Sequence, residues 1–351
     1  MGANSFGRFF TVTTFGESRS LGVGAVIDGC PAGVPLKNED IQSALNRRKP
    51  SPLLRGGKEV KTAHIFSTTR AEEDLCEILS GVYLEKTLGS PIAVLVKNKE
   101  TSFKNYENLK DIYRPGHADY AYEIKYGFRD YRGGGRASGR ETVGRVIGGA
   151  CARAFLNSYF EKTGQKKTEI KIWAEEIAGI KTSPVFENSA LPENISEKLL
   201  QLSREGDSAG CVLSAEVLNV PKGLGSPVFY KLDAVLSQAL MSIGAVKGVE
   251  IGGGFASASL PASENNKIGK NYSGGISGGI SEDNIFFRLS VKAPPSIRKE
   301  QTAFNSEGEK IKLSVTGEHD VCLFPRIVPV VEAMVYLTLA DSVLASVNDR
   351  V

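Results

Sequence analysis

One stretch near the end of the chain most restricts the fold. Residues 327–347, IVPVVEAMVYLTLADSVLASV, are apolar on almost every face of a helix. Such a helix has to be buried. It nevertheless carries Glu332 and Asp341, and a carboxylate there must be paired, capped or raised in pKa. Two interpretations stay open: an ion pair with a core arginine, or an acid–base group that faces a pocket.

A second stretch, residues 114–155, predicts an anion site in front of a helix. Ahead of that helix it holds five arginines, one histidine, four tyrosines and three successive glycines, 133–135. Ser138 and Glu141 have the spacing of a capping box, and apolar residues follow at helical spacing. A helix start offers free N–H groups to a phosphate. The alternative is a solvated basic surface loop.

The charge balance favours a small ligand over nucleic acid. The 351 residues carry a net charge of only +3, so the arginine cluster is a local feature. The five cysteines are scattered, which predicts a reducing compartment, no disulfide framework and no metal site. We find no signal peptide and expect no membrane-spanning run, so we expect a cytoplasmic protein without a membrane or nucleic-acid partner.

The order of elements predicts one large domain, 1–351, built from two similar halves. An apolar strand followed by Pro-x-Gly appears near residue 23 and again near residue 211, and each half ends in a long helix. We therefore expect pseudo-repeated halves of about 1–165 and 205–351. Strands are expected over 6–14, 23–27, 92–97, 169–180 and 285–292, and helices over 38–47, 141–155, 195–204 and 329–344. Residues 51–66 are expected to form a loop or hairpin.

Four segments together resemble chorismate synthase. They are FGRFFTVTTFGES, RPGHADYAYEIKYGFRDYRGGGRASGRET, ALMSIGAVKGVEIGGGF and HDVCLFPRIVPVVEAMVYLTLAD, in the family's order and over nearly the whole chain. The resemblance implies an α+β fold, a β-α-β sandwich, and the anti 1,4-elimination of phosphate from 5-enolpyruvylshikimate 3-phosphate to give chorismate in the shikimate pathway. It also implies reduced FMN as cofactor, with no net redox change, and a homotetramer. The usual outside reductants would keep the flavin reduced, and NADP is associated with the family through them.

The resemblance also implies roles for individual residues. His117 would donate a proton to the leaving phosphate, Asp341 would help to remove the ring proton, and Arg19 stands where the family has a histidine. The substrate is a polyanion, which suits arginine forks; Arg48, Arg114, Arg140 and Arg326 would bind it. The flavin would be held by Arg136, Ala137, Ser138, Gly244, Ala245, Gly278, Lys292, Ala293, Pro294, Pro295, Ser296 and Glu318.

Several positions depart from the family pattern, mostly around the flavin. The motif Gly-Glu-Ser-His-Gly reads Gly-Glu-Ser-Arg-Ser at 16–20, and an arginine cannot give up a proton at working pH. The motif Gly-Arg-His-Asp-Pro has Glu318 in place of its arginine. Because the two changes have opposite signs, we expect that Arg19 pairs with Glu318. Gly244 replaces an asparagine, two hydroxyls are lost within 292–296, and Arg55 is either a shifted family arginine or an unrelated residue.

Three functions are compatible with these departures. The first is an active chorismate synthase with a modified flavin site. The second is a non-catalytic homologue that binds anionic ligands or partners. The third is a different flavin-dependent lyase on the same scaffold. The Arg114–His117 motif and Asp341 favour the first, whereas the changes at Arg19 and Glu318 favour the second.

Overall fold

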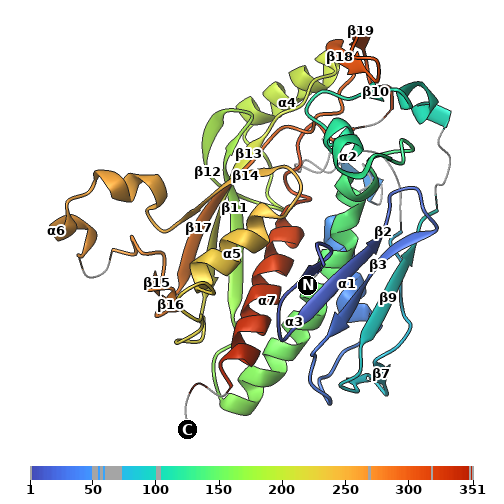
Figure 1. Cartoon of the computed structure of the whole chain (residues 1–351). Coiled ribbons are helices and arrows are strands. Elements are labelled where there is room, and N and C mark those ends of the chain that lie inside the picture. Colours follow the sequence, from blue (N-terminus) through green and yellow to red (C-terminus); the bar gives the residue numbers. More distant parts are fainter. Residues whose placement is uncertain are drawn as a thin grey trace.

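The computed structural model describes residues 2–49, 73–99, 104–267, 270–317, 319–347 and 349, with the short strands 54–55 and 58–59. Two five-stranded antiparallel sheets enclose a central pair of long helices, α3 (Thr142–Thr163) and α7 (Val328–Ala345), which lie side by side in Figure 1. The fold is therefore a sheet–helix–sheet sandwich of the α+β class.

The first sheet comes from the N-terminal part of the chain and has the strand order β1-β2-β3-β9-β6. Its strands are β1 (Ser5–Phe6), β2 (Thr11–Gly16), β3 (Gly22–Asp28), β9 (Ile92–Lys97) and β6 (Cys76–Ile78). Along β9 buried residues alternate with partly exposed ones until the exposed last residue, because one face packs against the helices and the other faces outward. Strands β3 and β9 confirm the strands expected at these positions. The single strand expected over 6–14 is wrong: β1 and β2 pair with each other as two antiparallel strands joined by residues 7–10.

The second sheet has the order β12-β11-β13-β17-β14. Its strands are β12 (Ile180–Phe186), β11 (Glu169–Ile177), β13 (Cys211–Leu218), β17 (Ile285–Val291) and β14 (Val246–Ile251). Because β11 and β12 precede residue 205, the second sheet begins before the second half that the sequence predicts. The pseudo-repeat with halves 1–165 and 205–351 stays a prediction.

The remaining elements extend from this sandwich. The helices are α1 (Asn38–Arg48), α2 (Asp119–Tyr126), α4 (Glu193–Glu205), α5 (Leu232–Met241) and α6 (Ala262–Asn265), with 3-10 turns at Lys104–Leu109, Gly135–Ala137, Gly139–Glu141 and Gly254–Ser259. A small sheet joins β10 (Ile112–Tyr113), β18 (Gln301–Asn305) and β19 (Lys310–Leu313). Three further pairs of short strands are β4 (Leu54–Arg55) with β5 (Lys58–Glu59), β7 (Val82–Tyr83) with β8 (Lys86–Thr87), and β15 (Ile276–Ser277) with β16 (Ile280–Ser281). Helices α1, α3, α4 and α7 confirm the four expected helices, and β4–β5 confirms a hairpin within 51–66.

Glycines let the central helices approach their neighbours closely. A Cβ atom at Gly149 of α3 would lie 2.4 Å from the Cβ of Ala333 in α7, and one at Gly144 would lie 2.7 Å from the carbonyl oxygen of Gly24 in β3. Real Cβ atoms do not approach this closely, so only glycine fits at these two points. The core thus forms around α3 and α7 and extends to both sheets.

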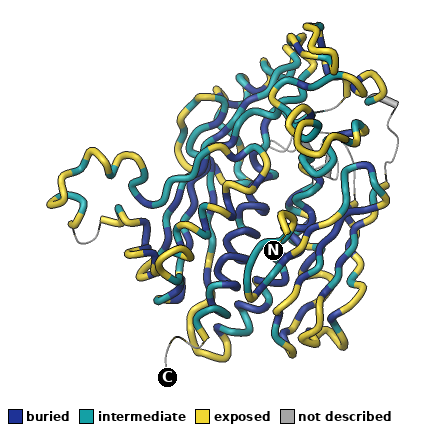
Figure 2. The backbone as a smooth tube through the Cα atoms, viewed as in Figure 1, coloured by how far each residue is buried: buried dark blue, intermediate teal, exposed yellow. Residues whose placement is uncertain are grey.

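Helix α7 is buried as its sequence predicts, and Figure 2 shows burial concentrated on the central helices and the inner faces of the sheets. Among the residues that the structure describes, α7 is also the one helix long and apolar enough to cross a membrane, contrary to our expectation of no such run. However, 78% of this window is buried inside the fold. A central core helix accounts for its composition.

The two acids of α7 have different partners. The Oε2 atom of Glu332 lies 2.7 Å from Nη1 of Arg47, which also binds Glu187. The Oδ1 atom of Asp341 accepts hydrogen bonds from the backbone N–H groups of residues 8, 9 and 10, at 2.7, 2.6 and 3.1 Å. An ion pair with arginine therefore explains Glu332, and capping of backbone amides explains Asp341.

Candidate active site

Arg114 and Asp119 form a buried ion pair at the start of α2. Arg114 donates through Nε to Oδ2 of Asp119 at 2.7 Å and through Nη2 to Oδ1 at 2.8 Å, which is a two-pronged geometry. The backbone N–H of Arg114 also donates to Asp119. The side chains are only 4% and 6% exposed. The turn between them, 115–118, is held rigidly from both ends.

His117 lies within this turn and contacts the same carboxylate. Its Nδ1 is 2.9 Å from Oδ1 of Asp119 and 3.2 Å from Nη2 of Arg114. Arginine can only donate and a carboxylate only accepts, so Nδ1 cannot form a hydrogen bond with both. The contact with Asp119 is the shorter one, and it assigns a proton to Nδ1. Nε2 is then the nitrogen that can exchange a proton with a ligand. Asp119 was not among the residues predicted from sequence, although it follows His117 by two positions.

The pKa of Asp119 lies well below its usual range. Burial acts to raise this pKa, but hydrogen bonds from Arg114 and His117 outweigh it. The folded-state pKa is therefore below the unfolded value of about 4. The ionised pair stabilises the fold fully above that pH, and this contribution is lost as the pH falls below it.

We expect to see this pH dependence of stability when the free energy of unfolding in urea is measured for the wild type and for Asp119→Asn between about pH 6 and pH 3. The wild type should lose free energy of unfolding as the pH falls below about 4, whereas the variant starts lower and loses less. Equal losses in the two proteins would contradict the assignment of an ionised Asp119.

The glycine loop 133–135 brings Arg19 to the same place. The carbonyl of Gly133 accepts from Nη2 of Arg114 at 2.9 Å. A Cβ atom at Gly133, where φ is +121°, would lie 2.8 Å from Oγ of Ser18 and 3.3 Å from Cγ of Arg19. Arg19 is buried, and its guanidinium carbon lies 5.3 Å from the centre of the Tyr106 ring. Arg19 and Arg114 therefore both lie against Gly133, and His117 contacts Arg114.

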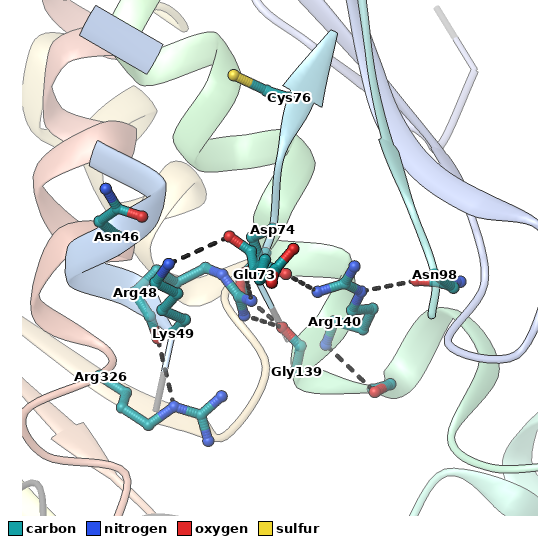
Figure 3. A network of polar contacts seen from close by, with 12 residues as sticks. Asn46, Arg48, Lys49, Glu73, Asp74, Cys76, Asn98, Gly139, Arg140 and Arg326 are labelled. Atoms are coloured by element: carbon teal, nitrogen blue, oxygen red, sulfur yellow. Dashed lines mark hydrogen bonds and ion pairs between the residues drawn. The ribbon is translucent and has the colours of Figure 1, made fainter. Parts of the chain in front are cut away.

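A second cluster of arginines surrounds Asp74 (Figure 3). Arg48, the last residue of α1, donates from Nη2 to Oδ2 of Asp74 at 2.5 Å, and Arg140 donates from Nη1 to Oδ1. Arg326 donates from Nε to the carbonyl of Arg48 at 3.3 Å and binds both oxygens of Asp320 at 2.6 Å. Three of the four arginines predicted to bind substrate thus lie together.

Asn98 connects the two clusters. Its Oδ1 accepts from Nε of Arg140 at 2.8 Å, and its Nδ2 donates to the carbonyls of Glu17 and Ser20 at 3.0 and 2.8 Å. The loop 16–20, which carries Arg19, is therefore tied to the Asp74 cluster. Neither Asn98 nor Asp74 could be recognised from sequence, because their partners are 42 and 66 residues away.

Each of the two clusters contains a buried polar atom without a hydrogen-bond partner in the protein. Within the described ranges, Oγ of Ser18 and Nε of Arg48 are buried and have no hydrogen-bond partner. Buried polar groups in folded proteins nearly always have one. The two atoms therefore indicate that a polar ligand or water completes each cluster.

The segment after β17 lies against the His117 turn. The backbone N–H of Lys292 donates to the carbonyl of Ala245 at 2.9 Å, and its Nζ donates to the carbonyl of Gly116 at 2.6 Å. A Cβ atom at Gly116 would be 3.3 Å from Cβ of Pro295. Ala245 has a φ of +74°, and the Cβ positions of Gly244 and Gly278 are open. Lys292, Pro295 and Ala245 thus form a wall beside the His117 turn. Gly278 lies in the β15–β16 hairpin instead, where the neighbouring carbonyl of Gly279 accepts from the backbone N–H of Leu232 at the start of α5, away from α2 (Figure 1).

Two predicted site residues, Arg136 and Asp341, make hydrogen bonds within the fold. Arg136 donates to the carbonyl of Gly16 at 3.1 Å and to the carbonyl and hydroxyl of Thr14, so its guanidinium supports β2. Asp341 lies 13 residues into α7, roughly 20 Å along the helix from its start beside Arg326. The structure therefore does not bring Asp341 to the arginine clusters.

The predicted capping box forms only in part. The hydroxyl of Ser138 accepts from the backbone N–H of Arg140 at 3.2 Å, which caps the 3-10 turn before α3. Glu141 does not reach back to Ser138; its carboxylate accepts from Arg145 and Thr14 instead. The competing arginine explains this difference. Glu318 and its expected pairing with Arg19 lie outside the described residues, as does the side chain of Arg55.

Comparisons with known proteins agree over the whole chain. The family model described as chorismate synthase matches residues 10–344. Chorismate synthase of Treponema denticola is 64% identical over 370 aligned positions, with all of both chains covered. Chorismate synthase of Lachnoclostridium phytofermentans is 44% identical, with 100% of this chain and 97% of the relative covered. A crystal structure of chorismate synthase superimposes with a TM-score of 0.72 at 27% identity, covering 97% of this chain and 94% of the other.

Proposed function

Since this chain belongs to the chorismate synthase family, we propose that the Arg114–His117–Asp119 cluster and the Asp74 cluster together form the site where it acts on 5-enolpyruvylshikimate 3-phosphate. The reaction is the elimination of phosphate to give chorismate, with reduced FMN as cofactor. The observation that carries this assignment is the hydrogen-bonded unit of Arg114, His117 and Asp119. It combines a fixed cation with a histidine whose tautomer is set.

The arginines are suited to a substrate with two carboxylates and a phosphate ester. Arg48, Arg140 and Arg326 come from three different elements and converge near Asp74. Their planar forks match the geometry of carboxylate and phosphate oxygens. We assign substrate binding to these three residues and to Arg114. Because their partners already fix their orientation, little side-chain entropy is lost when an anion binds.

His117 acts on the leaving phosphate. As the C–O bond to phosphate breaks, negative charge grows on the phosphate oxygens. His117 donates a proton from Nε2, while its Nδ1–H stays on Asp119. Arg114 adds a fixed positive charge beside it. Arg19, which stands at the histidine position of the family motif, cannot donate a proton and contributes charge alone.

The residues at the flavin positions fit a flat cofactor with a phosphate. Gly244 and Gly278 offer open backbone, the buried hydroxyl of Ser18 needs a polar partner, and Lys292 brings positive charge. We assign FMN binding to 137–138, 244–245, 278 and 292–296. When bound, reduced FMN supplies electron density to the breaking C–O bond and recovers it afterwards. Arg136 supports this wall through β2.

We also propose a cytoplasmic homotetramer, with the flavin kept reduced by outside NADP-dependent enzymes. Large apolar side chains at Phe229 and Phe255 are 88% and 86% exposed, which supports contacts with further copies of the chain.

The decisive assay follows chorismate absorbance and phosphate release under anaerobic conditions, with the purified protein, reduced FMN and 5-enolpyruvylshikimate 3-phosphate. Equal amounts of both products are expected. FMN binding without turnover would contradict the proposal and favour the non-catalytic homologue that the change at Arg19 allows. Arg19→His is a useful companion, since it restores the family residue beside Gly133.

A further inference from the structure

Asp74 is a buried carboxylate shared by two arginines. Its side chain has no exposed surface, and its two oxygens are divided between Arg48 and Arg140. The pKa of Asp74 is held below its usual range: burial acts to raise it, but the two guanidinium groups outweigh burial. Asp74 is therefore an anion inside the protein, although the substrate that this site binds is itself an anion.

The backbone at Asp74 is specifically held in place. Its φ is +50°, a left-handed conformation that costs a residue other than glycine about 1 kcal/mol or more. Nε2 of Gln42 donates to the carbonyl of Asp74 at 3.1 Å, and Oε1 of Gln42 accepts from the backbone N–H of Cys76 at 3.0 Å. One side chain of α1 thus fixes the segment that carries Asp74.

Each arginine is also anchored on its other side. Nη1 of Arg48 donates to the carbonyl of Gly139 at 3.3 Å and to Thr142 at 3.4 Å. Nε of Arg140 donates to Asn98 at 2.8 Å. Burial is the main cause that lowers the pKa of Arg48, and the positive charges on Arg326 and Arg140 act in the same direction, so these guanidinium groups repel one another. Asp74 is the group placed to offset that repulsion (Figure 3).

We propose that Asp74 is a positioning residue of the substrate site: it holds Arg48 and Arg140 at a fixed separation so that both meet the same anionic part of the substrate. This inference rests on the proposed function, which assigns the two arginines to substrate binding. Asp74 itself does not contact the substrate. Its effect is transmitted through the two guanidinium groups.

The direction in which KM changes in Asp74→Asn distinguishes a positioning role of Asp74 from a role in charge balance alone. The substitution keeps the shape of the side chain and makes the site more positive by one charge. If Asp74 only reduced the net positive charge of the site, the variant would bind the anionic substrate more tightly and KM would fall. Under our proposal the arginines shift, and KM rises by about 10- to 100-fold with a smaller change in kcat, because displacements of about 1 Å can cost about 100-fold.

The matched control is Glu73→Gln, which removes the neighbouring acid. Glu73 is exposed and pairs with Lys99 at 2.6 Å, away from the arginines. We expect wild-type KM and kcat from this control. Inorganic phosphate provides a second probe: as a competitive inhibitor it should bind less tightly to Asp74→Asn than to the wild type. Unchanged or lower KM in Asp74→Asn would overturn the proposal.

Two further variants keep the outcomes distinct. Asp74→Glu retains the charge but moves it by one methylene, so a raised KM is expected here too, whereas a charge-only role predicts the wild-type value. Failure of both Asp74 variants to fold, seen as loss of the unfolding transition, would overturn the proposal in favour of a purely structural role. Arg140→Gln tests whether Arg140 binds the substrate at all. An unchanged KM in this variant refutes the proposed substrate site itself. A raised KM in Arg140→Gln together with a wild-type KM in Asp74→Asn refutes only the role of Asp74.

Discussion

His117→Ala should lower kcat by about 100- to 10,000-fold, the range that a positioned proton donor contributes, while KM changes much less. The reason is the geometry around the ring. Nδ1 contacts Asp119 at 2.9 Å and keeps its proton there, so the doubly protonated ring donates from Nε2. Substrate binding depends mainly on the arginines, which the substitution leaves in place.

Anaerobic steady-state assays with reduced FMN measure this effect. Lys125→Ala is a suitable control, because Lys125 is an exposed residue on the same short helix, α2. Added imidazole should partly restore kcat in His117→Ala, since it can replace the missing acid but cannot repair a misfolded turn. A variant with normal kcat, or one whose loss appears only in KM, would contradict the role of His117 as proton donor.

Asp341→Ala should destabilise the fold by about 2–4 kcal/mol, because one buried and two partly buried backbone amides lose their acceptor, and a buried unpaired donor costs about 1–3 kcal/mol. The amides belong to residues 8–10, which lead into β2 of the first sheet. Loss of this acceptor therefore loosens the start of the chain from the core helix. Urea unfolding followed by circular dichroism measures the change.

Asp341→Asn distinguishes this structural role from the acid–base role that the family resemblance implies. The amide oxygen can still accept from residues 8–10, so most of the stability and the activity should be retained. If Asp341 removed the ring proton, the asparagine variant would fold normally and lose turnover. The two interpretations therefore predict opposite results for a single substitution.

Long elements with a clear period could be predicted from the sequence. Helices α1, α4 and α7 and strands β3, β9, β11 and β17 were expected within a few residues of their observed ends, whereas α3 continues to Thr163, beyond its expected end at 155. Helix α2 was missed because its apolar residues do not face a core: Tyr120, Ile124 and Tyr126 are all more than half exposed. A pattern rule that depends on burial cannot find a helix of this kind.

The arginines of the candidate site were named from the sequence, but the aspartates that bind them were not. Arginines in a glycine-rich stretch indicate an anion site from composition alone, whereas Asp74 and Asp119 gain their importance from partners brought close by folding. Asp341 shows the same limit. A carboxylate in an apolar helix must have a partner, but the sequence does not say that the partner is the backbone 333 residues earlier.

The bond between Asp341 and residues 8–10 also has a consequence for biosynthesis. A ribosome makes the N-terminal part of the chain first, and domains usually begin to fold as they emerge. The first sheet of this protein cannot complete its anchoring until α7 has left the exit tunnel, because its acceptor lies on that last long helix. Nascent chains that stop before residue 341 should therefore remain protease-sensitive near the N-terminus and depend on chaperones until synthesis is finished.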